Sequence, residues 1–330
     1  MPALCPTRRR RSRRWTTSWC APAWSWTTMA EPPFWERNLI YRVLSGSRAY
    51  GLDRPDSDED TRGVCIPPAE YLLGLQTFEQ HKDETQNHTV FALAKFVRLA
   101  LDANPNIIET LYTDPQHVLF INRYGERLVA ARDRFLSRRV GERFSGYAID
   151  QLQRMARHHR WLVDPPDHAP APEEFGARDV GGRYRWPHSD AERAYRAAAR
   201  HWANYRAWLA NRNPVRAELE ARYGYDTKHA THLLRLLRMG EEILREGVVR
   251  VLRPDAEWLL AVRNGALTYD AVLALAAEHQ ARLAAVIASS PLPAEPAVTA
   301  ADALLIELQT EFLLGAQSSR VNGQPTFARP

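Results

Sequence analysis

Cysteine is scarce in this chain of 330 residues, which has three, and Cys65 is the only one beyond residue 20. One thiol cannot form an intrachain disulfide or a cysteine-rich zinc site, so neither is expected in the body of the chain. Long apolar runs are also missing, because no stretch approaches the ~20 residues that a membrane-spanning helix needs. With 45% hydrophobic residues, the chain is predicted to be a folded cytoplasmic protein with no membrane span.

Beyond its first 28 residues the chain has no net positive charge. The formal charge is +5, but residues 1–28 hold six arginines and no acid, so the remainder sums to 5 − 6 = −1. The apolar part of this segment, CAPAWSW, is too short and too interrupted for an export signal. We interpret residues 1–28 as an extension upstream of a true start at Met29, or as a disordered arginine-rich arm. The arm leaves a nucleic-acid-binding protein as one alternative.

Residues 29–119 alternate between short apolar strands and helices, as in an α/β or α+β unit. Apolar and β-branched runs predict strands at 38–44, 61–66 and 88–90. A short helix is predicted at 47–52, and a longer one at 91–102 has its apolar residues on one face. This region is therefore predicted to contain a small mixed sheet with flanking helices.

Residues 120–315 are predicted to form a mostly helical domain. Apolar residues recur at threes and fours in several segments, at 120–134, 137–162, 189–211, 227–246, 256–263, 269–288 and 299–314. Residues 164–188 are dense in Pro, Gly and charge, which predicts a long loop. Residues 316–330 are interpreted as a tail.

Two acids, Asp58 and Asp60, precede the second predicted strand in PDSDEDTRGV. Side chains two apart on a strand lie on the same face, so these carboxylates can share Mg²⁺ or Mn²⁺ while Glu59 points away. Upstream, the Gly46-Ser47 turn lets the backbone approach a phosphate group at the start of a helix. The combination predicts a site that presents a nucleoside triphosphate (NTP) to metal ions. A solvated acidic turn is the alternative interpretation of the acids.

The same stretches resemble the DNA polymerase β-type nucleotidyltransferase superfamily. Gly46-Ser47, ten residues, and Asp58-Glu59-Asp60 match its signature. SGSRAYGL, PDSDEDTRGV, FALAKFVRLALDANPNIIETLY and GYDTKHATHLLRLLRMGEEIL are similar to a predicted group that includes the RNA-ligase-associated nucleotidyltransferases proposed to act in RNA repair. The resemblance covers about residues 38–314. It implies a minimal nucleotidyltransferase sheet followed by a helical domain.

The resemblance also implies the chemistry and the site. Gly46 and Ser47 would hold the triphosphate, and Asp58 and Asp60 would bind Mg²⁺ or Mn²⁺. A nucleotidyl group would pass from an NTP to an acceptor, which is left open as an RNA end, a protein or a small molecule. The sequence does not indicate the oligomeric state.

The third carboxylate of the superfamily is expected on the next strand. Counting back from Phe91 and Phe96 places it at Asn87, an amide that cannot take a proton from an acceptor hydroxyl. Asp83 or Glu84 would substitute if the strand were shifted. Otherwise the chain would be a nucleotide-binding regulatory protein with weakened or lost transferase activity.

The remaining candidates are basic residues and histidines. Lys228 and His229 fall in GYDTKHATH and are expected to contact phosphate or line the cleft; a capped helix with a charged surface is the structural alternative. Arg48 is expected at the mouth of the pocket, and Arg62 either faces phosphate or forms an ion pair. A zinc site at His229 and His232 would need a third ligand that the sequence does not indicate.

Overall fold

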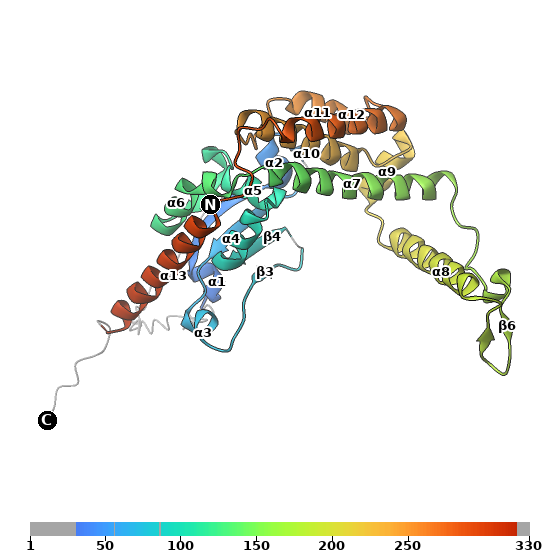
Figure 1. Cartoon of the computed structure of the whole chain (residues 1–330), viewed down its shortest axis with the longest axis horizontal. Coiled ribbons are helices and arrows are strands. Elements are labelled where there is room, and N and C mark those ends of the chain that lie inside the picture. The colour runs from blue at the N-terminus through green and yellow to red at the C-terminus, as the bar shows by residue number, and fades with distance from the viewer. Residues whose placement is uncertain (1–30, 56, 86, 322–330) are drawn as a thin grey trace, which may run out of the picture. The chain divides into compact units, whose positions relative to one another are not determined.

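A five-stranded mixed sheet forms the N-terminal part of the fold. A computed structural model describes residues 31–55, 57–85 and 87–321 (Figure 1). The strands are β1 (Leu39–Ser45), β2 (Asp60–Cys65), β3 (Gln80–Lys82), β4 (His88–Ala92) and β5 (Val118–Ile121). Their order across the sheet is β3-β4-β2-β1-β5, and β2 and β4 are parallel while the other pairs are antiparallel. The predicted mixed sheet is confirmed.

Two of these strands, β3 and β5, were not predicted. The second half of β5, Phe120 and Ile121, falls at the start of the segment 120–134 that was expected to be helical, and that expectation was wrong for these two residues. A four-residue apolar run has no clear period, so its pattern alone cannot distinguish a strand from a helix. β5 pairs with β1, and the predicted domain boundary after residue 119 falls inside it.

Five helices accompany the sheet segments along the chain, namely α1 (Phe34–Arg37), α2 (Gly46–Tyr50), α3 (Ala69–Leu72), α4 (Leu93–Leu101) and α5 (Pro105–Leu111). α4 follows β4 directly and buries Leu93, Phe96 and Val97 on one face. α5 begins with a proline in its first turn, and the side chain of Asn104 accepts a hydrogen bond from the backbone N–H of Asn106. This cap explains why the chain restarts a helix here.

The rest of the described chain is largely helical, as predicted. Its α-helices are α6 (Arg123–Ala130), α7 (Arg139–Val163), α8 (Ser189–Ala210), α9 (Pro214–Tyr223), α10 (Thr227–Glu246), α11 (Ala256–Arg263), α12 (Tyr269–Ile287) and α13 (Val298–Val321). Short 3₁₀ turns and one small hairpin complete it: η1 (Pro115–His117), η2 (Arg132–Phe135), η3 (Pro172–Phe175), β6 (Arg178–Asp179) and β7 (Tyr184–Arg185). α9 was not predicted, and α13 runs beyond its predicted end at 314.

The predicted terminal segments lie largely outside the described residues. The proposed N-terminal extension, 1–28, falls wholly outside them, and so does the part of the predicted tail after Val321. Within the described ranges, no helix combines the length and apolarity needed to cross a membrane.

α10 is the central helix of the helical part and connects it to the sheet. It buries Leu233, Leu236 and Leu237, and they belong to the same hydrophobic core as Ile40 of β1 and Val64 of β2. One core thus spans the two parts of the fold, which fixes the position of α10 relative to the strands that carry the predicted acids.

A buried ion pair adds polar contacts at the same junction. The guanidinium of Arg235, on α10, donates to the Glu109 carboxylate on α5, and the hydroxyl of Tyr50, on α2, donates to the other oxygen of Glu109 at 2.5 Å. The Arg235 guanidinium also lies 3.8 Å from the centroid of the Tyr50 ring. All three residues are buried, so α2, α5 and α10 are held together where α2 meets the predicted site.

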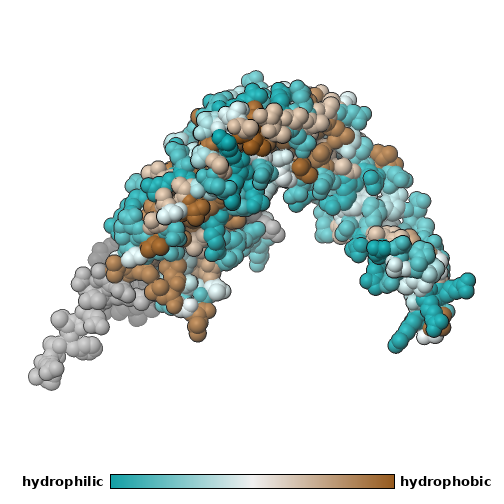
Figure 2. Space-filling view, in the orientation of Figure 1, coloured by the Kyte–Doolittle hydropathy of each residue, from teal (hydrophilic) through white to brown (hydrophobic). Residues whose placement is uncertain are grey.

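α8 differs from α10 because Ala191 is the single buried residue among its 22. Its contact with α7 includes Trp208, whose ring centroid lies 5.3 Å from that of Trp161. Figure 2 shows mainly hydrophilic residues over the segment that contains α8 and the β6–β7 hairpin. Contacts between aromatic rings, most of them partly exposed, hold this segment, in contrast to the fully buried core around α10.

Candidate active site

The Gly46-Ser47 turn packs against the side chain of Asp60, the second of the two predicted acids. Gly46 has a φ of +66°, a left-handed conformation that favours glycine. A Cβ at this position would clash with Oδ2 of Asp60 and lie 3.1 Å from its Cγ. Ser45 pairs with Asp60 across β1 and β2, which brings the start of α2 next to the carboxylate. Glycine is thus needed at 46 both for its backbone angle and for the approach of Asp60.

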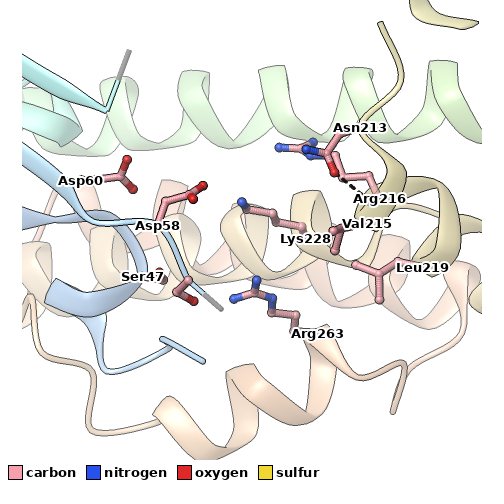
Figure 3. A pocket seen from close by; sticks show the side chains of 10 residues that line it. Ser47, Asp58, Asp60, Asn213, Val215, Arg216, Leu219, Lys228 and Arg263 are labelled. Carbon is pink, nitrogen blue, oxygen red and sulfur yellow. Dashed lines mark hydrogen bonds between the residues drawn. The ribbon is translucent and has the colours of Figure 1, made fainter. Parts of the chain in front are cut away.

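A cleft opens beside this turn and receives both predicted acids (Figure 3). It is lined by Ser47, Ser57, Asp58, Asp60, Asn213, Val215, Arg216, Leu219, Lys228 and Arg263. β2 begins at Asp60, and Asp58 lies in the loop before it. The prediction that the two acids share a strand was therefore wrong for Asp58, although both line the cleft.

Arg48 and Arg62 are used for structure rather than for lining this cleft. Arg48 donates to the backbone carbonyl of Ser57 at 3.1 Å and to that of Asp58 at 3.4 Å, so it supports the loop that carries the first acid. Arg62 donates to the carbonyl and side-chain oxygens of Asn106, at 3.2 and 3.0 Å, and so links β2 to α5. Neither arginine is among the residues that line the cleft.

Asn87 immediately precedes β4, the parallel neighbour of β2 in the sheet. β2 and β4 are parallel with Thr61 opposite His88, and the N–H of Thr61 donates to the carbonyl of Asn87 at 2.9 Å. One residue back along both chains, this register places Asn87 next to Asp60. Parallel partners point their side chains to the same face of a sheet, so this extended register would put Asn87 on the Asp60 face. Asn87 is not among the residues that line the cleft.

Asp83 occupies a different environment, in the turn between β3 and β4. Its carboxylate accepts a hydrogen bond from the backbone N–H of His88 at 2.9 Å and another from the hydroxyl of Thr85. These bonds lower the pKa of Asp83. Glu84 lies exposed in the same turn. The register therefore favours position 87 over 83 or 84 as the neighbour of Asp60.

Three cationic side chains line the other side of the cleft, as Figure 3 shows. Lys228 is in the first turn of α10, Arg216 is near the start of α9, and Arg263 ends α11. Lys228 was predicted, whereas Arg216 and Arg263 were missed. Asn213-Pro214 is a capping residue followed by proline, a signal for a helix start that was overlooked. Nothing in the spacing of Arg263 relates it to residues near position 60.

His229 is not among the residues that line the cleft, which corrects its predicted role there. Its side chain is buried, with Nδ1 2.8 Å from Oε1 of Gln151 and Nε2 2.8 Å from Nη1 of Arg216. Burial lowers the pKa of His229 to about 4. Its imidazole clusters with His158 and Asp226, not with His232 as the zinc alternative required. No spacing or motif associates His158, about 70 residues upstream, with this helix start.

Like charges lie together on each side of the cleft. Burial raises the pKa of the Asp60 carboxyl, and the neighbouring Asp58 adds to this effect, while Arg62 and Lys228 oppose it. Burial lowers the pKa of the Lys228 ammonium, and Arg216 and Arg263 lower it further. The acidic side would be stabilised by an added cation and the basic side by an added anion.

A mixed sheet that presents a Gly-Ser turn and two carboxylates to one cleft has the arrangement implied by the resemblance to polymerase β-type nucleotidyltransferases. The RlaP family, described as the RNA repair pathway DNA polymerase beta family, matches residues 30–307. Because this match covers most of the chain, the chain belongs to that family.

Two curated proteins are similar over shorter stretches. An uncharacterized 38.9 kDa protein in the nrdC-mobD intergenic region of Enterobacteria phage T4 is 31% identical over 91 residues, covering 24% of this chain and 27% of the phage protein. The uncharacterized protein YcgL of Bacillus subtilis (strain 168) is 35% identical over 83 residues, covering 23% of this chain and 31% of YcgL. The aligned part therefore spans less than a third of either relative. No solved structure matches the chain.

Proposed function

We propose that this protein transfers a nucleotidyl group from an NTP to a hydroxyl group, with Mg²⁺ or Mn²⁺ as the metal. Membership of an RNA repair family favours an RNA end as the acceptor over a protein or a small molecule. The observation that carries the proposal is the charge distribution of the cleft. Asp58 and Asp60 lie on one side, and Lys228, Arg216 and Arg263 lie on the other.

The donor atoms at the acidic side fit a hard divalent cation. Asp58 and Asp60 offer carboxylate oxygens, the ligand type that Mg²⁺ prefers. The raised pKa of Asp60 reflects burial and the nearby Asp58, and a bound cation would offset both effects. When bound, the metal would neutralise charge on the entering and leaving oxygens.

The chain's own residues would bind and orient the triphosphate. Lys228, Arg216 and Arg263 would contact phosphate oxygens from the basic side, and Ser47 would contact them beside the acids. The acceptor oxygen would bond to the α-phosphorus as the bond to the bridging oxygen breaks and pyrophosphate leaves. The hydroxyl proton would pass to solvent, because the amide of Asn87 cannot accept it.

Asn87 also supports a second candidate function, a regulatory protein that binds nucleotide without transferring it. A triphosphate supplies several oxygen ligands of its own, so two carboxylates suffice for metal-dependent binding. Transfer additionally benefits from a base within hydrogen-bond reach of the acceptor. The two candidates share the binding step and differ in product formation.

Incubation with each labelled NTP, Mg²⁺ or Mn²⁺ and a panel of RNA ends tests both candidates. We expect label on RNA with wild-type protein, and loss of both metal-dependent binding and transfer in Asp58→Asn and Asp60→Asn. Glu59→Gln is the matched control, since it removes an acid between them that does not line the cleft. Metal-dependent NTP binding without a labelled product would favour the regulatory protein. Equal binding by Asp58→Asn and wild type would refute the site.

A further inference from the structure

A second group of potential metal ligands lies in the helical part, outside the residues that line the acidic side of the cleft. It contains His158 of α7, Asp226, which caps α10, and His229 in the first turn of α10. One donor atom from each residue lies within 4.8 Å of the others. Asp226 and His229 are buried and His158 is partly buried, so the group is largely shielded from solvent.

In Asp226 and His229, hydrogen bonds to the other polar atom of each side chain leave one donor atom available for a metal ion. The Oδ1 atom of Asp226 accepts from the backbone N–H groups of Lys228 and His229, which leaves Oδ2 directed at the cluster. The Nδ1 atom of His229 lies 2.8 Å from Oε1 of Gln151, an acceptor, so Nδ1 carries the proton and Nε2 has a lone pair. An outer hydrogen bond of this kind orients the histidine ligand at metal sites.

The spacing of these atoms is close to that of a tetrahedral site. Bonds of about 2.0–2.1 Å from a central zinc ion give ligand-to-ligand distances of roughly 3.4 Å. Nε2 of His229 and Oδ2 of Asp226 are 3.5 Å apart, so they need almost no movement. His158 has to approach by a rotation of its ring within the 4.8 Å group.

His158 and a nearby acid supply the remaining contacts. The Nδ1 atom of His158 is buried without a hydrogen-bond partner, a costly state for a polar atom. It lies 3.6 Å from Oε1 of Glu220, a carboxylate whose side chain is 1% exposed. The other oxygen of Glu220 is bound by Arg212 at 2.8 and 2.5 Å, which leaves Oε1 to hold the His158 ring in place. Two imidazoles and one carboxylate form a ligand set suited to Zn²⁺.

The guanidinium of Arg216 already binds two of the proposed ligand atoms. Nη1 of Arg216 lies 2.9 Å from Oδ2 of Asp226 and 2.8 Å from Nε2 of His229. These are the two atoms whose spacing best suits a metal ion. The guanidinium and a metal ion would compete for the same lone pairs, and both satisfy the same negative charge.

We propose that His158, Asp226 and His229 form a binding site for a divalent transition metal that competes with Arg216, with Glu220 orienting the His158 ring. Zn²⁺ is the ion that this ligand set suits best. Binding displaces the Arg216 guanidinium from Asp226 and His229. Arg216, near the start of α9, also lines the cleft. Its displacement would therefore change the charge of the cleft when the metal binds. The site itself does not depend on the proposed transferase activity.

The test measures Zn²⁺ binding by titration calorimetry and equilibrium dialysis with the full chain. An Asp58→Asn/Asp60→Asn background removes metal binding at the acidic side of the cleft. In this background we expect one Zn²⁺ per chain, with Kd raised at least tenfold by His158→Gln or His229→Gln. Removing even the outer partner of a ligand typically costs about 10–100-fold in affinity, and Gln151→Ala should fall in this range. His168→Gln, a change at an exposed histidine of the 164–188 loop, is the matched control and should leave Kd unchanged.

Arg216→Met makes the competition measurable and does not remove a ligand. Without the guanidinium, the metal no longer has to displace a bound competitor, so Kd should fall by roughly tenfold or more. Thermal unfolding of each variant in the absence of metal checks that it remains folded. Zn²⁺ binding that survives both histidine variants, or that disappears in the Asp58→Asn/Asp60→Asn background, would overturn the proposal and leave the transferase proposal untouched. An unchanged or higher Kd in Arg216→Met would overturn the competition with Arg216.

Discussion

Gly46→Ala should perturb the fold and the candidate site together. The φ of +66° places an alanine in the left-handed region, which costs about 1–2 kcal/mol. The new methyl group would also clash with Oδ2 of Asp60 and lie 3.3 Å from its Cβ. Forcing a carboxylate aside in a packed region adds about 1–3 kcal/mol. The expected loss in the free energy of unfolding is therefore about 2–5 kcal/mol.

Gly247→Ala is the matched control for the cost of placing an alanine in the left-handed backbone conformation. Gly247 follows α10 with a φ of +69°, and an added Cβ would meet nothing closer than Cδ2 of Leu292 at 3.8 Å. It should cost about 1–2 kcal/mol. In an Asp60→Ala background, Gly46→Ala should fall to this same cost, because the group that it displaces is gone.

These free energies can be measured by urea unfolding of wild type, Gly46→Ala, Asp60→Ala, the double variant and Gly247→Ala. Metal-dependent NTP binding provides the functional readout, and Gly46→Ala should reduce it while Gly247→Ala should not. Equal destabilisation by Gly46→Ala with and without the Asp60 side chain would show that the clash is not the cause. Unchanged metal-dependent NTP binding in Gly46→Ala would show that the Gly46-Ser47 turn does not contribute to the binding site.

The sequence predicted the sheet strands and helices whose patterns are local and long enough to be read. β1 has an apolar, β-branched run that stops at Ser45-Gly46, and α10 begins with a capping Asp226 followed by a strong apolar period. β5 has four residues whose pattern fits a strand or a helix. It forms a strand because it pairs with β1, and that pairing cannot be predicted from the local sequence. Tertiary contact decided this element.

The candidate site divides in the same way. Asp58, Asp60 and Gly46 are near one another in the chain, so a local pattern could relate them. Arg263 meets Asp60 in one cleft although 203 positions separate them, from 60 to 263. His229 was misplaced because its helix face depended on Arg216 and on His158, residues of other helices. Side chains that converge from distant segments have no signature in a single sequence.

Three further changes test the junction, the electrostatics and the third acid position. Glu109→Gln should lower the free energy of unfolding by about 3–5 kcal/mol in urea, because it leaves the buried Arg235 charge without its partner. Asp60→Asn should raise the melting temperature at pH 7 in the absence of metal. The folded pKa of Asp60 is raised, so its ionised form opposes folding once the pH exceeds that pKa, and a gain that persists at pH 3 would contradict this sign. Asn87→Asp should increase nucleotidyl transfer, since the β2–β4 register, extended by one residue before the Thr61–His88 pair, places position 87 next to Asp60, where a carboxylate can take the acceptor proton. Such a base contributes roughly 10²–10⁴-fold to a rate, so single-turnover assays with labelled NTP should resolve the increase while NTP affinity changes little. Asn87→Leu, which offers neither ligand nor base, is the control, and a rate in Asn87→Asp no higher than wild type would mean that another group takes the proton.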